Sequence, residues 1–482
     1  MRLKWILHII GFLILATGAS MALPLLYSLR HADAGFRPLL SSQLILLAIG
    51  FVLTWLFRSD FSHGQALDAR EGVATVAGGW LVVGLLGGLP YLLGGVFSTF
   101  TDAAFESFSG FSTTGSSVLA NVESVAPSLL LWRGMTHWLG GMGIIVLSLA
   151  ILPYLGVGGM QLYRAEVPGP DSDKLTPRLR DTAAVLWRVY LAMTAVMTCL
   201  LLFGDMNFFE ALAHTFATVA TGGFSTRNAS LGGFSAYSQW ICILFMLMAG
   251  INFSLHFNLL RGKAEAFLAD EEFRLYALIA AAATAITTAS LLIGGLEFEP
   301  ALRAAAFQIV SIMTTTGFVT ADYEAWAPLC QTLLVILMLL GGSAGSTSGG
   351  IKCMRVLVLG KLLYREVFRL VHPSAVRLTK FNGSALPRNV IDGCVGFAVL
   401  FFLIWMVSSL LLAAAGVDVA TAASAALSCL SNVGPGFGSV GPTENFRHLP
   451  LLAKWILSLD MVLGRLELFT LFVLCFPEFW RR

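Results

Sequence analysis

Long apolar runs alternate with short polar segments along the whole chain. Runs of about 20 apolar residues are long enough to cross a lipid bilayer as helices. The pattern predicts ten such spans, with boundaries near residues 5–27, 39–57, 73–96, 128–154, 183–204, 237–260, 274–296, 327–351, 389–415 and 449–476. We therefore expect an all-α integral membrane protein, embedded in a lipid bilayer.

Four of the polar segments on one side of the predicted membrane contain an additional short apolar stretch. A stretch of about a dozen residues is too short to span. Each stretch ends in small polar residues followed by a glycine, and these glycines are Gly115, Gly222, Gly317 and Gly434. Span, re-entrant helix and span therefore recur as an internal repeat. The predicted repeats cover 71–165, 166–265, 266–380 and 381–482, after an accessory two-helix region at 1–70.

Four re-entrant segments predict a central pore. Non-helical backbone at membrane depth is tolerated only where it lines water or is buried in protein. Backbone carbonyls can replace the water shell of a potassium ion, and glycine gives the backbone the freedom to point them inward. The residues expected to bind potassium in this filter are Thr113, Thr114, Gly115, Ala220, Thr221, Gly222, Thr315, Thr316, Gly317, Asn432, Val433 and Gly434. Any one Thr-Gly turn is ordinary in a membrane protein, but its recurrence four times on one side favours a filter.

The run 341–350 interrupts a long apolar stretch. Its ten residues are all Gly, Ser, Ala or Thr, which do not hold a continuous helix well. Small residues also serve close helix packing, whereas a flexible break in mid-membrane is tolerated only beside a pore. The glycines that we expect to give this segment its mobility are Gly341, Gly342, Gly345, Gly349 and Gly350.

Arg465 lies within the last apolar run, with Asp460 and Glu467 nearby. A charge inside the membrane is costly and faces a cavity or a partner. Two interpretations remain open: a structural ion pair with a neighbouring carboxylate, or a positive charge just below the filter. Lys454 is nearer the outer end, where its side chain is expected to extend toward the interface.

Three runs resemble a known family: 341–355 (GGSAGSTSGGIKCMR), 429–438 (CLSNVGPGFG) and 463–470 (LGRLELFT). With the four loops, they resemble the Trk/Ktr/HKT superfamily of potassium transporters, and within it the Trk-type membrane subunit, over essentially the whole chain. The resemblance implies potassium selectivity with glycine at Gly115, a gate formed by 341–350, and an electrostatic role for Arg465. It also implies a homodimer and a cytosolic TrkA-like partner that binds NAD and ATP.

Charge gives the expected orientation. The segments 58–71, 156–182, 261–274 and 352–388, together with the two chain ends, hold 21 of the 30 Lys and Arg residues. The positive-inside rule places them and both termini in the cytoplasm of a bacterial cell. We expect the partner to dock on 156–182 and 352–388.

Other function classes find less support in the sequence. A secondary transporter coupled to protons or sodium would need an ionisable relay, for which Arg465 with Asp460 and Glu467 is the candidate cluster. The sequence has no nucleotide-binding motif and no triad of an enzyme, so we expect neither a bound nucleotide nor catalysis, and no nucleic acid partner. The seven cysteines have no metal-ligand spacing. His137, His214 and His256 are expected to be hydrogen-bonded packing residues, with Arg133 and His137 near the outer mouth.

Overall fold

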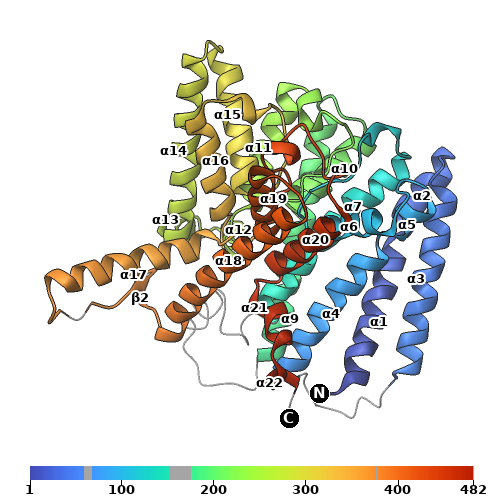
Figure 1. Ribbon diagram of the computed structural model, residues 1–482, viewed down its shortest axis with the longest axis horizontal. Coiled ribbons are helices and arrows are strands. Elements are labelled where there is room, and N and C mark those ends of the chain that lie inside the picture. Colours follow the sequence, from blue (N-terminus) through green and yellow to red (C-terminus); the bar gives the residue numbers. More distant parts are fainter. Residues whose placement is uncertain (59–67, 151–174, 376, 481–482) are drawn as a thin grey trace.

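The computed structural model describes residues 1–58, 68–150, 175–375 and 377–480, and nearly all of its regular structure is helical (Figure 1). Parts of the predicted cytoplasmic segments 58–71 and 156–182, the boundary at 165, and the last two arginines lie outside these ranges. The N-terminal elements are α1 (Leu3–Ser20), α2 (Ala22–His31) and α3 (Phe36–Leu56). Helices α1 and α3 approach closely, because a Cβ added at Gly50 would lie 2.9 Å from the carbonyl oxygen of Gly11.

The next two predicted repeats contain a long helix, a short helix and a second long segment. The first has α4 (Ala69–Leu86), α5 (Leu89–Leu93), α6 (Phe100–Phe111), the 3-10 turn η1 (Val122–Ser124) and α7 (Pro127–Ala150). The second has α9 (Leu175–Leu202), α10 (Phe208–Val219), η4 (Ser230–Gly233), α11 (Ala236–Ala249), α12 (Phe253–Leu260) and α13 (Glu265–Ala269).

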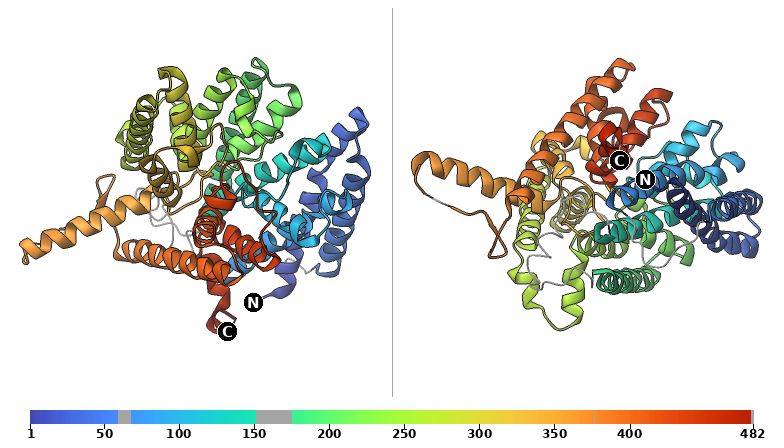
Figure 2. Two further views of the ribbon diagram at one scale, coloured as in Figure 1. Left: turned by 45° about the horizontal axis from the view of Figure 1, so that its top comes forward. Right: turned by 90° about the horizontal axis from the view of Figure 1, so that it is seen from below.

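The last two predicted repeats follow the same plan. The third has α14 (Glu271–Ile293), α15 (Phe298–Met313), η5 (Tyr323–Ala325), α16 (Pro328–Leu340) and α17 (Cys353–Val371). The fourth has α18 (Arg388–Ala414), α19 (Val419–Ser431), η6 (Gly438–Val440), α20 (Leu451–Arg465), α21 (Phe469–Phe472), η7 (Val473–Cys475) and α22 (Pro477–Trp480). Figure 2 shows the elements of the four repeats following one another around a common centre.

Among the described residues, six helices are long and apolar enough to cross a membrane, and the bent pair α11 and α12 makes a seventh if it is taken as one span. The other three predicted spans correspond to α7, α16 and α20. Two predictions of a continuous span are wrong: the span at 237–260 bends by 100° at a break between its two helices, and the one at 449–476 is interrupted after Arg465. The span at 327–351 ends at Leu340, directly before the run 341–350 that was expected to interrupt it. These breaks all lie beside the buried centre, where the backbone contacts protein instead of lipid.

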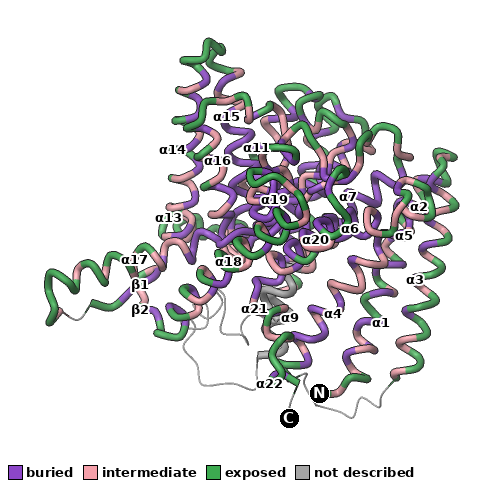
Figure 3. The backbone as a smooth tube through the Cα atoms, in the orientation of Figure 1, coloured by how far each residue is buried: buried purple, intermediate pink, exposed green. Residues whose placement is uncertain are grey.

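The four short helices α6, α10, α15 and α19, here called the re-entrant helices, occupy the buried centre, whereas the outer helices expose apolar side chains (Figure 3). On α3, for example, Phe51 and Trp55 are 63% and 67% exposed. Exposed apolar surface of this kind suits contact with lipid.

A small hairpin precedes α18. Strands β1 (Lys380–Phe381) and β2 (Ser384–Ala385) pair antiparallel around Asn382 and Gly383, which both have positive φ. Asn-Gly is the preferred two-residue turn of this type, and the all-helical prediction missed it. Helix α17, which leads toward the hairpin, extends away from the body of the molecule (Figure 1).

Candidate functional site

Each re-entrant helix ends in the same backbone motif. In α6, Thr113 has φ +54°, its N–H donates to the carbonyl of Gly110, and the next N–H, of Thr114, donates to Ser109. This pair of bonds around a left-handed residue is a Schellman motif. The left-handed residues of the four helices are Thr113, Thr221, Thr315 and Asn432. The shared motif turns the chain away from each helix in the same direction.

A glycine with positive φ follows two residues after each left-handed residue, and these four glycines close a ring. They are Gly115, Gly223, Gly317 and Gly434. A Cβ added to any of them would meet a carbonyl oxygen of the following loop. The distances are 2.2 Å from Gly115 to Gly222, 2.0 Å from Gly223 to Thr316, 2.0 Å from Gly317 to Val433 and 2.7 Å from Gly434 back to Thr114. We call residues 113–115, 221–223, 315–317 and 432–434 the filter loops.

The ring corrects the predicted register of the second loop by one residue. The glycine that corresponds to Gly115 is Gly223, not Gly222, and Ala220 lies outside the loop as the C-cap of α10. Gly222 instead occupies the position of Thr114. Glycine is needed there for a different reason, since a Cβ would lie 2.4 Å from the ring of His137. Two adjacent glycines made the sequence pattern ambiguous.

Four carbonyl groups, all on buried residues of the filter loops, have no hydrogen-bond donor in the part of the chain that the structure describes. They belong to the residues before the ring glycines: Thr114, Gly222, Thr316 and Val433. Among the described residues, no N–H or O–H group donates to these oxygens. A buried carbonyl normally has a partner, so an unpaired set requires an explanation. Carbonyl oxygens gathered in this way are suited to replace the water of a dehydrated cation.

Polar side chains lie behind three of the filter loops, and sequence reasoning had named one of them, His214, as a hydrogen-bonded packing residue without linking it to a loop. Nine residues before the ring glycine stand Glu106, His214 and Gln308. Glu106 accepts from the N–H of Val118 at 2.9 Å, and His214 Nε2 lies 2.9 Å from Ser225 Oγ. The amide oxygen of Gln308, in its satisfied orientation, accepts from the N–H of Thr320 and Ala321 at 2.7 and 3.1 Å. Each of these three re-entrant helices thus fixes the chain just after its own filter loop.

The fourth repeat departs from this arrangement. Ala425 stands at the corresponding position, and the adjacent Ser424 takes over the role. Its hydroxyl donates to the carbonyl of Phe437 at 2.8 Å and accepts from the N–H of the same residue at 3.0 Å. The equivalence became visible only when the register of the glycines was known.

Arg133 and His137 support the second filter loop from within the protein. Arg133 Nε donates to Glu106 at 2.6 Å, and its guanidinium lies over the ring of Phe224. His137 Nδ1 lies 2.9 Å from the carbonyl oxygen of Gly110, and its Nε2 accepts from the N–H of Phe224 at 3.3 Å. Both side chains are buried, so they brace the first repeat against the second.

The segment 341–352, here called the intramembrane loop, is non-helical and lies against the filter loops. The N–H of Gly349 donates to the hydroxyl of Thr315 at 2.7 Å, and a Cβ added at Gly349 would lie 2.2 Å from the carbonyl oxygen of Ser431. The hydroxyl of Thr347 donates to the carbonyl of Val219 at 3.2 Å. The loop therefore contacts the ends of three re-entrant helices.

Arg465 is joined to this loop and not to a carboxylate. Its Nη1 donates to the carbonyl oxygen of Thr347 at 2.6 Å, while Nε and Nη2 have no partner among the described residues. Asp460 accepts from Ser408, and Glu467 pairs with other basic residues. The structure contradicts the interpretation of Arg465 as half of an ion pair.

Lys454 corrects another expectation. Its side chain does not extend to the interface, because it is buried and its amine lies 2.6 Å from Asp102 Oδ1 at the start of α6. The buried pair fixes the outer end of α20 to the first re-entrant helix. Within the described residues, no group of three His, Cys, Asp or Glu side chains forms a metal site.

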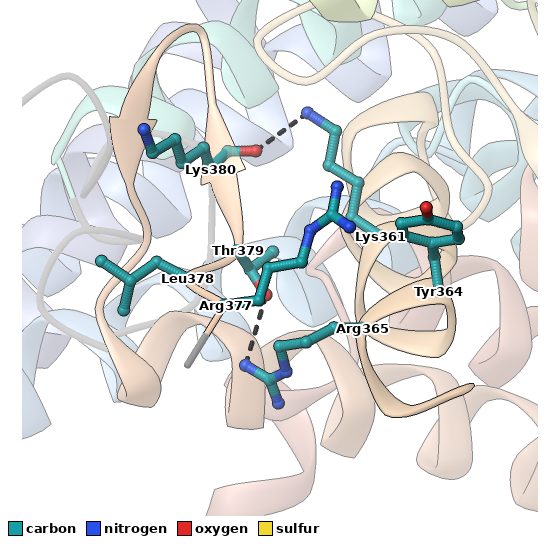
Figure 4. Close-up of a pocket in the computed structure, with 7 residues that line it drawn as sticks. All are labelled: Lys361, Tyr364, Arg365, Arg377, Leu378, Thr379 and Lys380. Carbon is teal, nitrogen blue, oxygen red and sulfur yellow. Dashed lines mark hydrogen bonds between the residues drawn. The ribbon is translucent and has the colours of Figure 1, made fainter. Parts of the chain in front are cut away.

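A cavity of about 530 Å³ lies between α17 and the chain leading into the hairpin (Figure 4). Its lining is basic and consists of Lys361, Tyr364, Arg365, Arg377, Leu378, Thr379 and Lys380. The amine of Lys361 donates to the carbonyl of Lys380 at 2.8 Å and the guanidinium of Arg365 to the hydroxyl of Thr379 at 3.3 Å.

Comparison with known proteins places this ring of loops in a family. The family model TrkH, described as a cation transport protein, matches residues 40–481. The chain belongs to the TrkH family. It is 41% identical to the Trk system potassium uptake protein TrkH of Escherichia coli strain K12, and each chain is covered completely. The corresponding TrkG protein of the same strain is 32% identical, with 100% of this chain and 99% of TrkG covered.

A solved structure of the family agrees with the fold. The crystal structure of the potassium transporter TrkH from Vibrio parahaemolyticus matches with a TM-score of 0.91 and 37% identity, and the match covers all of both chains. The predicted family and helical membrane fold are confirmed. As a TrkH-family member, the chain is a multi-pass membrane protein of a transport family, not an enzyme.

Proposed function

We propose that this chain carries potassium ions into the cell across the cytoplasmic membrane, through the filter loops. The observation that carries the proposal is the closed ring of four loops with buried, unpaired carbonyl groups at Thr114, Gly222, Thr316 and Val433. Such a ring can coordinate a cation that has lost its water. The relatives whose names specify potassium uptake support the choice of ion.

The proposed gate is the intramembrane loop together with Arg465. The loop is buried directly against the filter loops, so an ion leaving the filter meets it next. The Arg465 guanidinium, two of whose nitrogens have no partner in the described part of the chain, adds positive charge at the same level. Both features oppose passage of a cation until the loop moves.

Control of this gate is proposed to come from a cytosolic TrkA-like protein that binds NAD and ATP. In the proposed orientation, with both termini in the cytoplasm, the basic segments 156–182 and 352–388 would face this protein. The basic cavity beside α17 gives the second segment a surface that fits an acidic partner (Figure 4). A homodimer is the proposed assembly, as the sequence resemblance implies.

Coupling to protons is a second candidate function, favoured by Asp460. This carboxyl is buried, and its Oδ2 has no hydrogen-bond partner among the described residues. Ionisable groups at membrane depth serve as proton relays in coupled transporters. Simple conduction and coupled transport predict different responses to an imposed proton gradient.

Flux into liposomes that contain the purified chain tests the proposal. We expect rubidium, used as a tracer for potassium, to enter down its own gradient with no proton or sodium gradient imposed. An excess of potassium should block this uptake, whereas an equal excess of sodium should not. Uptake that appears only with a proton gradient would favour the coupled transporter, and uptake blocked equally by sodium would contradict the potassium filter.

A further inference from the structure

Two buried glutamate carboxyl groups lie at the edges of the intramembrane loop, outside the filter. Glu272 is near the start of α14, and Glu467 follows the end of α20, two residues after Arg465. Their exposed fractions are 4% and 5%. Burying a carboxyl group is costly unless it is hydrogen-bonded or paired. The partners of these two groups therefore show which parts of the protein they hold together.

Glu272 joins the two ends of the loop. One oxygen, Oε1, accepts from the backbone N–H of Ala344 at 2.7 Å and from that of Met354 at 2.9 Å. Ala344 lies near the beginning of the loop, and Met354 lies in the first turn of α17. The loop has few side chains to pack, so these two hydrogen bonds to one buried carboxyl oxygen contribute to its position.

Glu467 joins the end of the loop to the helix that carries Arg465. Its Oε1 lies 3.1 Å from Lys352 Nζ, and its Oε2 accepts from the guanidinium of Arg355. Lys352 and Glu467 have φ of +76° and +56°. Residues other than glycine keep such strained conformations only where their surroundings hold them, which the ion pairs do here.

The two carboxylates and Arg465 form one connected assembly. Arg465 binds the middle of the loop through the carbonyl of Thr347, and Glu467 binds its end through Lys352. A displacement of the first turn of α17 would therefore strain the contacts of Glu272 and Glu467 together. The loop and the Arg465 charge would be released by the same movement.

We propose that Glu272 and Glu467 are positioning residues that hold the intramembrane loop closed. Glu272 does this by joining the ends of the loop, and Glu467 by joining its exit to the chain that bears Arg465. The inference rests on the proposed function of the loop as a gate. It adds which contacts hold the gate closed, and that a displacement of the first turn of α17 would break them.

Replacement of Glu272 tests the proposal in full-length protein in liposomes without any partner. Glu272→Ala removes the acceptor shared by two backbone N–H groups, and we expect roughly ten-fold faster rubidium flux, the shift that loss of two hydrogen bonds from the closed loop gives. Glu272→Gln keeps an oxygen in the same place and should stay near the wild-type rate. Glu272→Asp, a milder change if the alanine variant does not fold, should raise the flux to a smaller extent.

Glu71→Ala is the matched control, because Glu71 is also buried near the start of a repeat's first helix but pairs with Arg2 and not with the loop. Its flux per folded molecule should not change. Hydrogen exchange at 341–354 should rise in Glu272→Ala and not in Glu71→Ala. Equal increases of flux in both variants would mean general destabilisation and would overturn the proposal.

Deletion of 345–349 separates this inference from the gate itself. If the deletion speeds flux while Glu272→Ala does not, the loop is a gate but Glu272 does not fasten it. If the folded deletion variant conducts no faster than wild type, the loop is not a gate, and the proposed function of the loop fails with the inference. Faster flux in both variants, with Glu272→Gln unchanged, supports both.

Discussion

The filter loops and the intramembrane loop are two stretches of buried, glycine-rich backbone that touch each other, yet different interactions hold them. The filter loops are held by their own helices, through four Schellman motifs, and by close contact between neighbouring loops. The intramembrane loop occurs once, and acceptors from other elements, Gly250 and Glu272 among them, hold it. Local and repeated interactions suit a rigid filter, whereas a few distant contacts suit a segment that moves.

The comparison predicts the largest effect at the ring of glycines. In Gly115→Ser, the new Cβ would lie 2.2 Å from the carbonyl oxygen of Gly222 at a φ of +88°, so the ring must distort. We expect potassium preference over sodium to fall by about ten-fold or more, since differences of ~1.4 kcal/mol in binding are enough. Tracer flux with each ion, and growth of a potassium-uptake-deficient strain in limiting potassium, measure it.

Gly95→Ser is the control for backbone strain alone. Gly95 also has positive φ, at +66°, but a Cβ there would meet nothing within 4 Å. Selectivity in this variant should match wild type. If both variants lose selectivity equally, the contact between neighbouring loops is not what makes the filter rigid.

Arg465→Gln should raise maximal potassium flux several-fold and leave folding intact. Among the described residues, Arg465 makes one hydrogen bond, to Thr347, and no ion pair, so its loss leaves none of their carboxylates unpaired. Flux and thermal unfolding of the purified variant are the measurements. A folded variant with unchanged flux would remove Arg465 from the gate and leave the intramembrane loop as the only moving barrier.

Lys454→Met, at the other end of α20, should lower stability and leave flux unchanged, the opposite of what we expect for Arg465→Gln. The change breaks the ion pair between the buried Lys454 and Asp102, whose side chain is partly exposed. Because water can still reach Asp102, the loss in the free energy of unfolding should be about 3 kcal/mol, at the low end for such pairs. Flux per folded molecule should stay near wild type. A variant of normal stability would show that this end of α20 does not fix the first re-entrant helix.

Asp205, in the segment before α10, should give the smallest effect. Desolvation alone would raise the pKa of this carboxyl, but hydrogen bonds from Ser238 and Ser235 outweigh it and lower the pKa. A lowered pKa in the folded state means that the carboxylate stabilises the protein above its unfolded pKa, and this stability is lost as pH falls through the folded pKa. Asp205→Asn should flatten the acid side of the profile of Tm against pH, measured in detergent. At any pH, the change in Tm should be smaller than the one that Lys454→Met causes. An unchanged profile would mean that the hydrogen bonds from Ser235, the N-cap of α11, and from Ser238 do not make Asp205 stabilising.

Some of the site could be predicted because its signals are local. A short apolar stretch followed by Thr-Gly specifies a helix that ends abruptly, and this appears in the sequence without any knowledge of the neighbours. The same reasoning failed at Gly222 and Gly223, because two glycines are equally able to take positive φ. The choice between them depends on His137, which lies in a different helix.

The sequence by itself determined the membrane-spanning pattern, the four repeated loops and the mid-membrane break at 341–350, since each follows from the order of apolar, small and charged residues. Only the tertiary structure decided which glycine closes the ring, that Arg465 binds Thr347 and not Asp460 or Glu467, and that Glu272 joins the ends of the intramembrane loop. These contacts join residues that lie far apart in the chain or on different elements. Spacing along a sequence specifies the conformation of one segment, but the partner of a buried polar group depends on which segments the fold brings together.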